Sequence, residues 1–312
     1  MSRLGATFEA LRARGERALV AFFTAGDPSL ETTARLVIEA ERRGADVIEL
    51  GVPFSDPVGD GPVIQRAGQR ALAAGASLRR ILELMRTLRG EVRVPIVLMT
   101  YYNPLLAFGL PAFAETASKV GVDGMIVLDL PPEESAELHA AADAAGLDMI
   151  YLVAPTTTAD RVRLIARQTR GFVYLVSLTG VTGERASLPP DLEAQVRAVR
   201  LVTTKPVCVG FGIGRPDQAA AVGRLADGVI VGSAIVRVIE EHLGSPSLVT
   251  AVGDFIASLK NPLRVIGAPP AATQVAVPSA GFARAIDGGR QGGSRRQARD
   301  DRPKGGGAPL RA

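Results

Sequence analysis

The chain has 312 residues, of which 47% are apolar and 22% charged, a composition typical of a globular protein with a full apolar core. No window approaches the roughly 18 uninterrupted apolar residues of a membrane span, and residues 1–18 have no apolar signal core, so we expect neither membrane insertion nor export. Cys208 is the single cysteine, which excludes an internal disulfide and a cysteine-based metal cluster and fits a cytoplasmic protein.

The net positive charge comes from the C-terminal end of the chain. Residues 269–312 carry eight Arg or Lys and three Asp, a net charge of +5, whereas the whole chain carries +4, so residues 1–268 carry −1. A basic tail can contact nucleic acid or acidic surfaces, but the main body has no such bias, and we expect no nucleic-acid binding.

Short apolar runs alternate with amphipathic helical patterns along the chain. Residues 3–14 predict a first helix, with Leu4, Phe8 and Leu11 on one face. Eight apolar runs predict strands: 18–23, 46–50, 95–100, 123–128, 148–153, 171–176, 206–210 and 226–231. The helical patterns between them include 29–43, 77–89, 133–145, 158–169 and 215–224.

This pattern predicts an α/β fold, the (β/α)8 or TIM barrel. Strands that are apolar on both faces and joined by helices indicate a parallel sheet covered on both sides, and eight such units are the barrel's number. The alternative is an open doubly wound sheet, but it would need a Gly-rich turn after its first strand, and TAGDP (24–28) matches that poorly. The helix at 3–14 is expected to plug the lower end of the barrel.

The predicted domain boundary lies near residue 268. Residues 1–268 carry the barrel pattern, and from 269 the sequence becomes rich in Gly, Pro, Arg, Ser and Gln. We predict a catalytic barrel domain over 1–268 and a disordered Gly/Arg-rich tail over 269–312.

Two carboxylates stand out near the second predicted strand. Active sites of such barrels form at the C-terminal ends of the strands. Glu49 lies at such an end among apolar residues, where partial burial would raise its pKa and suit it to proton transfer. Asp60 follows in a segment rich in Gly and Pro; it is a candidate second acid, although loop aspartates more often form caps and turns. Asp46, before the strand, is interpreted as solvated.

Glycines after the last two strands predict an anion site. Gly212, Gly232 and Ser233, closed by Gly183, are typical of a phosphate cup built from backbone N–H groups and a helix N-terminus. The alternative is that these glycines only form tight turns.

The expected pocket is apolar and holds no metal. Phe22 and Phe211 end strands and predict an aromatic lining, whereas Tyr101 and Tyr102 fit a pocket wall and a core or rim position equally well. Neither of the two histidines has partners at metal-ligand spacing. An apolar pocket beside an anion site implies a substrate that is half flat hydrophobe and half sugar phosphate.

Several motifs carry a family resemblance. They are TAGDPS (24–29), IELGVPFSDPVGDGPVIQRA (48–67), DLPPEES (129–135), LVAPTTT (152–158), GVTGER (180–185) and GFGI (210–213). From residue 7 to about 258 the sequence resembles the tryptophan synthase alpha subunit family. The resemblance implies a cytoplasmic carbon–carbon lyase of tryptophan biosynthesis that cleaves indole-3-glycerol phosphate to indole and glyceraldehyde 3-phosphate without a cofactor.

The resemblance also implies roles for individual residues. Glu49 aligns with the general acid/base, Asp60 with the residue that holds the indole N–H, and Thr182 with the residue that orders Asp60. The phosphate site aligns with Gly183, Gly212, Gly232 and Ser233. The indole pocket aligns with Phe22, Met99, Ile126, Leu152, Tyr174, Phe211 and Ile230.

The family implies a partner as well. Its alpha subunit works in an αββα heterotetramer and passes indole to a beta subunit, and Pro53 and Asp56 lie in the loop expected at that interface. Two alternatives remain open: a stand-alone lyase that releases free indole, and a non-catalytic subunit that only activates a beta subunit.

The sequence departs from the family pattern in three places. Gly59 replaces the usual Ala, Leu128 replaces a smaller or ring residue, and Leu178-Thr179 replaces Arg-Ala. The tail also has no family counterpart. None of these changes removes a residue with an implied catalytic role.

Overall fold

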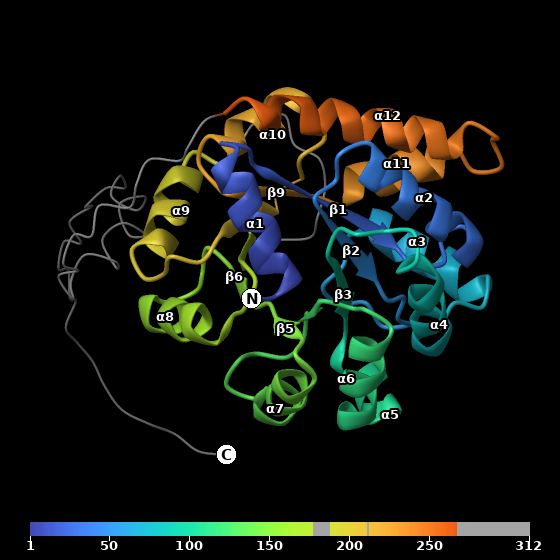
Figure 1. Ribbon diagram of the computed structural model, residues 1–312, viewed down its shortest axis with the longest axis horizontal. Coiled ribbons are helices and arrows are strands. Elements are labelled where there is room, and N and C mark those ends of the chain that lie inside the picture. Colours follow the sequence, from blue (N-terminus) through green and yellow to red (C-terminus); the bar gives the residue numbers. More distant parts are fainter. Residues whose placement is uncertain (177–187, 211, 267–312) are drawn as a thin grey trace, which may run out of the picture. The chain divides into compact units, whose positions relative to one another are not determined.

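The computed structural model describes residues 1–176, 188–210 and 212–266. By contacts the chain divides into two units, Met1–Val277 and Pro278–Ala312, and the second unit, like the predicted tail, lies outside the described residues. The first unit is an α/β structure with helices on the outside of a curled parallel sheet (Figure 1). No helix in the described ranges combines the length and apolarity needed to cross a membrane.

The strands are β1 (Ala18–Thr24), β2 (Val47–Gly51), β3 (Ile96–Thr100), β4 (Gly124–Val127), β5 (Asp148–Met149), β6 (Leu152–Val153), β7 (Val173–Val176), β8 (Val207–Gly210) and β9 (Gly228–Val231). The helices up to β5 are α1 (Arg3–Ala13), α2 (Leu30–Arg42), α3 (Pro62–Ala73), α4 (Leu78–Leu88), α5 (Tyr102–Phe108), α6 (Leu110–Lys119) and α7 (Ala136–Ala145). The later helices are α8 (Ala159–Gln168), α9 (Leu192–Arg200), α10 (Pro216–Gly223), α11 (Ser233–Glu241) and α12 (Leu248–Lys260), followed by the 3₁₀ helix η1 (Asn261–Arg264).

The parallel sheet closes into the predicted barrel. Its order is β5-β4-β3-β2-β1-β9-β8-β7-β6, so the two edges are successive pieces of one extended segment, 148–153. The first piece pairs with β4 and the second with β7, and the N–H groups of Ile150 and Tyr174 extend this pairing by donating to Met125 and Tyr151. The prediction of one uninterrupted strand over 148–153 is therefore wrong. The segment divides its pairing between two neighbours because barrel strands are staggered.

Local sequence signals explain where several helices begin. The hydroxyl groups of Ser2, Ser29 and Ser77 accept hydrogen bonds from backbone N–H groups in the first turns of α1, α2 and α4. Helix α3 starts at Pro62, where a proline costs no helical hydrogen bond. The Gly- and Pro-rich segment after β2 therefore ends at this helix, immediately beyond Asp60 and Gly61.

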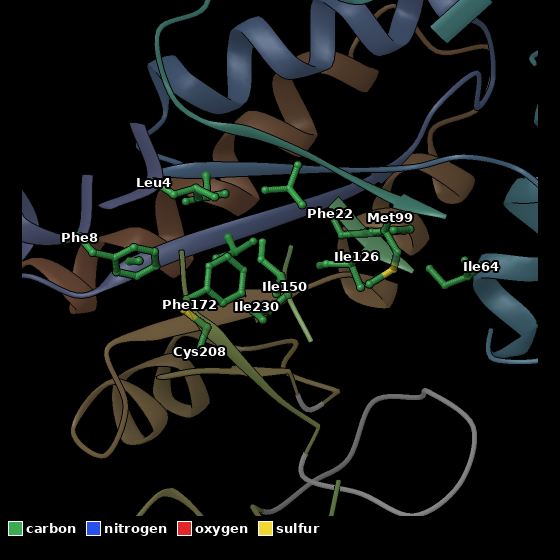
Figure 2. Packing of buried hydrophobic residues seen from close by; sticks show 14 of the residues in the cluster. Leu4, Phe8, Phe22, Ile64, Met99, Ile126, Ile150, Phe172, Cys208 and Ile230 are labelled. Carbon is green, nitrogen blue, oxygen red and sulfur yellow. The ribbon is translucent and has the colours of Figure 1, made fainter. Parts of the chain in front are cut away.

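The barrel interior is an apolar core that is closed from below by α1. Leu4, Phe8 and Leu11 of this helix belong to the same buried cluster as the inward-facing strand residues. The ring of Phe8 lies 5.7 Å from that of Phe172, centroid to centroid. In Figure 2, Phe8 lies at one end of this cluster and Ile64 at the other, with Met99 next to Ile64. The predicted N-terminal plug is confirmed, and it leaves the opposite, C-terminal end of the barrel as the open mouth.

A largely buried ion pair ties the end of α12 to the base of the barrel. Lys260, 2% exposed, donates to Asp46 at 2.9 Å and to the carbonyl oxygen of Arg17 at 3.0 Å. Asp46 also accepts the N–H of Leu19 at 2.7 Å. The interpretation of Asp46 as a solvated residue is therefore wrong. Burial raises its pKa, and the charge of Lys260 opposes that rise.

Lys260→Met should lower the free energy of unfolding by about 3 kcal/mol, because it leaves the Asp46 carboxylate without its cation in a poorly solvated site. Urea unfolding followed by circular dichroism would measure this. Lys119→Met is the matched control, since its ion pair with Glu115 is mostly exposed, and we expect a loss below about 1 kcal/mol. Equal losses in the two variants would show that the buried ion pair stabilises the fold no more than the exposed one.

Candidate active site

Glu49 is a fully buried carboxyl group at the mouth of the barrel. It is 1% exposed, and on the neighbouring strands it lies in register with Phe22 and Val97, both members of the apolar core. Within the described residues its Oε2 atom has no hydrogen-bond partner. Burial first, and then the charge of Asp60, raise its pKa to about 8. Glu49 is therefore mostly protonated at neutral pH and is buried more completely than the sequence predicts.

Asp60 lies between β2 and α3 and is held by its backbone. Its N–H donates to Pro57 at 3.1 Å, and its carbonyl oxygen accepts from the side chain of Gln65 at 2.9 Å. Burial raises the pKa of its carboxyl group to about 6, and a hydrogen bond from Tyr101 opposes that rise. At neutral pH Asp60 is therefore mostly ionised, in contrast to Glu49. The charge of Asp60 contributes to the raised pKa of Glu49, so the two predicted acids lie near enough to interact.

Tyr101 holds the Asp60 segment in place. Its side chain is 2% exposed, and its hydroxyl oxygen accepts the N–H of Gly59 at 3.0 Å while the hydroxyl group also bonds Asp60. Its ring packs against Phe54 with 5.2 Å between the centroids. Tyr101 therefore forms a wall of the pocket, the first of its two sequence interpretations. Its contact with Asp60 went unpredicted because 41 residues separate the two.

Tyr101→Phe should raise the pKa of Asp60, because the hydroxyl group that stabilises the ionised carboxylate is lost. We expect kcat to fall about tenfold, with a smaller change in KM, and the acidic limb of the pH–rate profile to move to higher pH. Tyr102→Phe, at the next position, is the control and should leave the profile unchanged. An unshifted acidic limb in Tyr101→Phe would limit Tyr101 to a packing role.

Six of the apolar residues expected to line the pocket belong to the apolar core cluster or pack against it, and two of them, Phe22 and Met99, line the pocket itself. Phe22, Met99, Ile126 and Ile230 belong to the buried core cluster, and Leu152 and Tyr174 pack against it. Two strand glycines make room for the rings. A Cβ atom on Gly51 would lie 2.6 Å from the Phe22 ring, and one on Gly210 would lie 2.7 Å from the Tyr174 ring.

The pocket at this mouth is nearly filled. Its volume of about 20 Å³ is room for about one water molecule, so a bicyclic ligand would need side chains to move. Phe22 and Met99 line the barrel side of the pocket, and Pro53, Asp60 and Tyr101 line the side of the β2–α3 segment. The β2–α3 segment therefore forms one wall of the pocket.

The predicted anion site lies beyond the ends of β8 and β9. These strands pair side by side, and Gly212 and Gly232 follow them. Gly212 has φ of +34°, a conformation that favours glycine. Ser233, 8% exposed, begins α11, and no side chain in the described part of the chain caps this helix. A glycine-rich turn and a helix N-terminus thus follow two neighbouring strands, an arrangement that would suit an anion.

Not every residue that the sequence predicts for the site or the partner interface can be placed as expected. Thr182, Gly183 and Phe211 lie outside the described residues. Of the two predicted interface residues, Asp56 is exposed, whereas Pro53 is buried and lines the pocket. The described residues contain no group of three or more His, Cys, Asp or Glu placed to hold a metal ion.

Comparisons with known proteins agree on one family. A family model described as "Tryptophan synthase alpha chain" matches residues 8–260. The tryptophan synthase alpha chains of Geobacter sp. (strain M21) and Geobacter sulfurreducens are 53% and 52% identical over 260 residues, which is 83% of this chain and 97% and 98% of those proteins.

Solved structures agree with this result. The tryptophan synthase subunit alpha of Legionella pneumophila str. Paris superimposes with a TM-score of 0.79 at 39% identity, covering 84% of this chain and 98% of that one. A Mycobacterium tuberculosis tryptophan synthase chain gives 0.77 at 36% identity, covering 85% of this chain and 99% of that one.

Proposed function

This chain belongs to the tryptophan synthase alpha chain family, and on that premise we propose that Glu49 and Asp60 divide the chemistry of its reaction between them. The family reaction is the cleavage of indole-3-glycerol phosphate to indole and glyceraldehyde 3-phosphate, and the chain is a carbon–carbon lyase of this kind. The observation that carries the residue assignment is the pairing of a buried acid of pKa about 8 with a second acid of pKa about 6. Such unlike environments are typical of two carboxyl groups with separate roles.

Glu49 acts first as a general acid. With a pKa of about 8 it holds a proton at neutral pH, and at 1% exposure it is shielded from bulk solvent. It transfers the proton to the indole carbon that bears the glycerol phosphate chain. The ring becomes an indolenine cation, and Glu49 becomes a carboxylate.

Glu49 then acts as a base. Its carboxylate takes the proton from the side-chain hydroxyl group next to the ring, a carbonyl group forms there, and the carbon–carbon bond breaks. The bonding electrons return to the ring and restore neutral indole. The proton that Glu49 gave is thereby replaced, so no cofactor or further acid is needed to complete the cycle.

Asp60 stabilises the cationic intermediate. Its carboxylate, ionised above pH about 6, accepts a hydrogen bond from the indole N–H, whose acidity increases as the ring becomes positive. This contact strengthens as charge develops, so it lowers the barrier rather than only the KM. Thr182 is proposed to order Asp60 when substrate is bound.

The glycerol phosphate end binds at the anion site. Backbone N–H groups at Gly183, Gly212, Gly232 and Ser233 are proposed to hold the phosphate, and the dipole of α11 favours its negative charge. The indole ring lies among the apolar residues of the mouth: Phe22, Met99, Ile126, Leu152, Tyr174, Phe211 and Ile230. Anchoring the phosphate in this way brings the ring carbon to Glu49.

Family members function with a beta subunit, and we propose an αββα complex for this chain. Asp56 is exposed on the β2–α3 segment and would contact the partner directly. Pro53 is a buried residue of the same segment and lines the pocket, so a partner that presses on this segment would also move a pocket wall. This arrangement supports coupling between partner binding and substrate binding.

Indole release tests the proposal. The purified chain is supplied with indole-3-glycerol phosphate, with and without a beta subunit, and indole is measured by chromatography. We expect slow release by the chain alone and faster turnover in the complex. High activity without a partner would favour a stand-alone lyase, and no release in either case would favour a non-catalytic activating subunit.

The catalytic domain is proposed to be residues 1–268, in the cytoplasm, with 269–312 dispensable for chemistry. Deletion of 269–312 should leave kcat and KM within about twofold of the full chain, because every residue assigned a role lies before it. Steady-state kinetics of both chains would measure this. Loss of folding in the shortened chain would show that the tail contributes to the structure.

A further inference from the structure

Leu128 is shared by two separate hollows. It lines the active-site pocket of about 20 Å³, and it also lines a cleft of about 450 Å³. We call this the β4–β6 cleft; its walls are residues 127–132, 151–152 and 156–157 together with Arg161 and Ile165. Leu128 is the position that the walls of the active-site pocket and of the cleft have in common, and Leu152, which is proposed to contact the indole ring, lines the cleft.

The Leu128 side chain lies where a dividing wall would stand. It directly follows β4, half-buried, and it packs against the apolar core cluster that includes the predicted indole pocket. Its backbone N–H donates to Thr100 at 3.0 Å, which continues the strand pairing and fixes the residue. On the other side, a Cβ atom on Gly59 would lie 3.8 Å from its Cδ1 atom. Shortening Leu128 would therefore remove material from between the pocket and the cleft.

The β4–β6 cleft does not have the character of a separate ligand site. Asp129 accepts the N–H of Tyr102 at 2.7 Å, and Arg161 pairs with Glu133 at 3.1 Å. The hydroxyl group of Tyr151 bonds Ser135 at 2.6 Å. The main polar groups of the cleft are already bonded to other protein groups. The cleft therefore offers space beside the pocket rather than a charged group that could bind a ligand of its own.

The two apolar residues on the barrel side of the pocket offer no such space. Phe22 and Met99 point into the barrel core, so shortening them leaves a cavity enclosed by packed side chains. A shortened Leu128 would instead connect the pocket to a hollow that already exists. A flat ring with a substituent could then extend into the cleft without displacing the core.

We propose that Leu128 sets the size limit for the indole ring, and that the β4–β6 cleft is a latent extension for substituents on its benzo ring. The substrate class is indole-3-glycerol phosphates with one added atom or small group on that ring. The inference rests on the proposed function. It assigns to Leu128, one of the departures from the family pattern, the role of a specificity-determining residue.

The test compares Leu128→Ala with the wild-type chain in complex with a beta subunit. The substrates are unsubstituted indole-3-glycerol phosphate and its 4-, 5-, 6- and 7-chloro derivatives, and the readout is the ratio of kcat/KM values. For at least one chloro isomer we expect the ratio to shift about tenfold or more toward the substituted substrate, which is the usual range for one added group in an apolar pocket. Leu128→Val should give a smaller shift in the same direction.

Leu130→Ala is the matched control. Leu130 lines the β4–β6 cleft but does not line the active-site pocket, so this variant enlarges the cleft and leaves the wall in place. Its selectivity ratios should stay within about threefold of wild type. Thermal unfolding of each variant shows whether it is folded, and Leu128→Val carries the test if Leu128→Ala is not.

Two results would overturn the role of Leu128: unchanged ratios in a folded variant, or the same shift in Leu130→Ala. Failure of wild type to cleave the unsubstituted substrate would instead count against the proposed function. Binding of a non-cleavable indole-3-alkyl phosphate and its chloro derivatives, followed by calorimetry, separates the two cases. Calorimetric binding reports the size of the pocket even where catalysis is absent. If Leu128 is the dividing wall, Leu128→Ala should bind at least one chloro derivative more tightly than wild type does.

Discussion

Glu49→Gln should reduce the turnover of indole-3-glycerol phosphate by about 10³-fold or more, because glutamine has no proton to give to the ring carbon. Glutamine keeps the shape of the side chain, so a non-cleavable indole-3-alkyl phosphate should bind with nearly the wild-type Kd. Single-turnover kinetics and calorimetry would measure the two effects separately. Retention of more than about a tenth of the wild-type rate, a difference of only about 1.4 kcal/mol in the barrier, would reject Glu49 as the general acid.

Glu49→Gln should also lose less stability at alkaline pH than the wild-type protein does. Folding raises the pKa of Glu49 from 4.5 to about 8, so between these values the native state binds more protons than the unfolded state. The contribution of Glu49 is therefore fully present below pH about 4.5 and is lost as the pH rises through about 8. At pH 9 the buried charge costs on the order of 5 kcal/mol, which Glu49→Gln removes.

Urea unfolding at pH 5 and pH 9 would test this linkage. Glu49→Gln should lose less stability than wild type between the two values. Glu115→Gln is the control, since Glu115 is largely exposed on α6 and its variant should follow the wild-type pH dependence. Parallel pH dependence of Glu49→Gln and wild type would contradict a buried, neutral Glu49. The burial that keeps Glu49 protonated near neutral pH also destabilises the fold at high pH, where the side chain must ionise.

The sequence predicts those features of the site that depend on short-range patterns. Apolar runs of strand length locate Glu49 at a strand end, and the alternation of side chains along each strand then directs it inward with Phe22 and Ile126. The glycines after β8 and β9 predict the anion site in the same way. In each case the signal and the structure lie within a few residues of one another.

Features that depend on contacts between distant residues were not predictable. Tyr101 reaches Gly59 across 42 residues, and Lys260 reaches Asp46 across 214, and neither pairing leaves a mark in the local sequence. The depth at which Glu49 is buried is likewise a property of the whole barrel, because neighbouring strands supply its surroundings. The interpretation of Asp46 as solvated was wrong for this reason, because its partner Lys260 lies at the end of α12, far away in the sequence.

Asp60→Asn should reduce turnover by about 10²-fold or more, because an amide group cannot supply the negative charge that offsets the developing indolenine cation. The loss should appear in kcat more than in the binding of an indole-3-alkyl phosphate, since the contact strengthens as charge develops. Steady-state kinetics and calorimetry would measure both. Asp254→Asn, an exposed position on α12, should behave as wild type. Near-normal turnover in Asp60→Asn would return Asp60 to a turn-forming role.

The residual activity of Asp60→Asn carries further information about Glu49. Wild-type kcat/KM should rise as Asp60 ionises near pH 6 and fall as Glu49 loses its proton near pH 8. The negative charge of Asp60 is one cause of the raised pKa of Glu49, so its removal should move the alkaline limb to lower pH and abolish the acidic limb. An unmoved alkaline limb would mean that the two carboxyl groups do not influence each other. A shift of the alkaline limb in Asp60→Asn would show that the charge of Asp60 acts on Glu49, which the loss of turnover in either variant does not show.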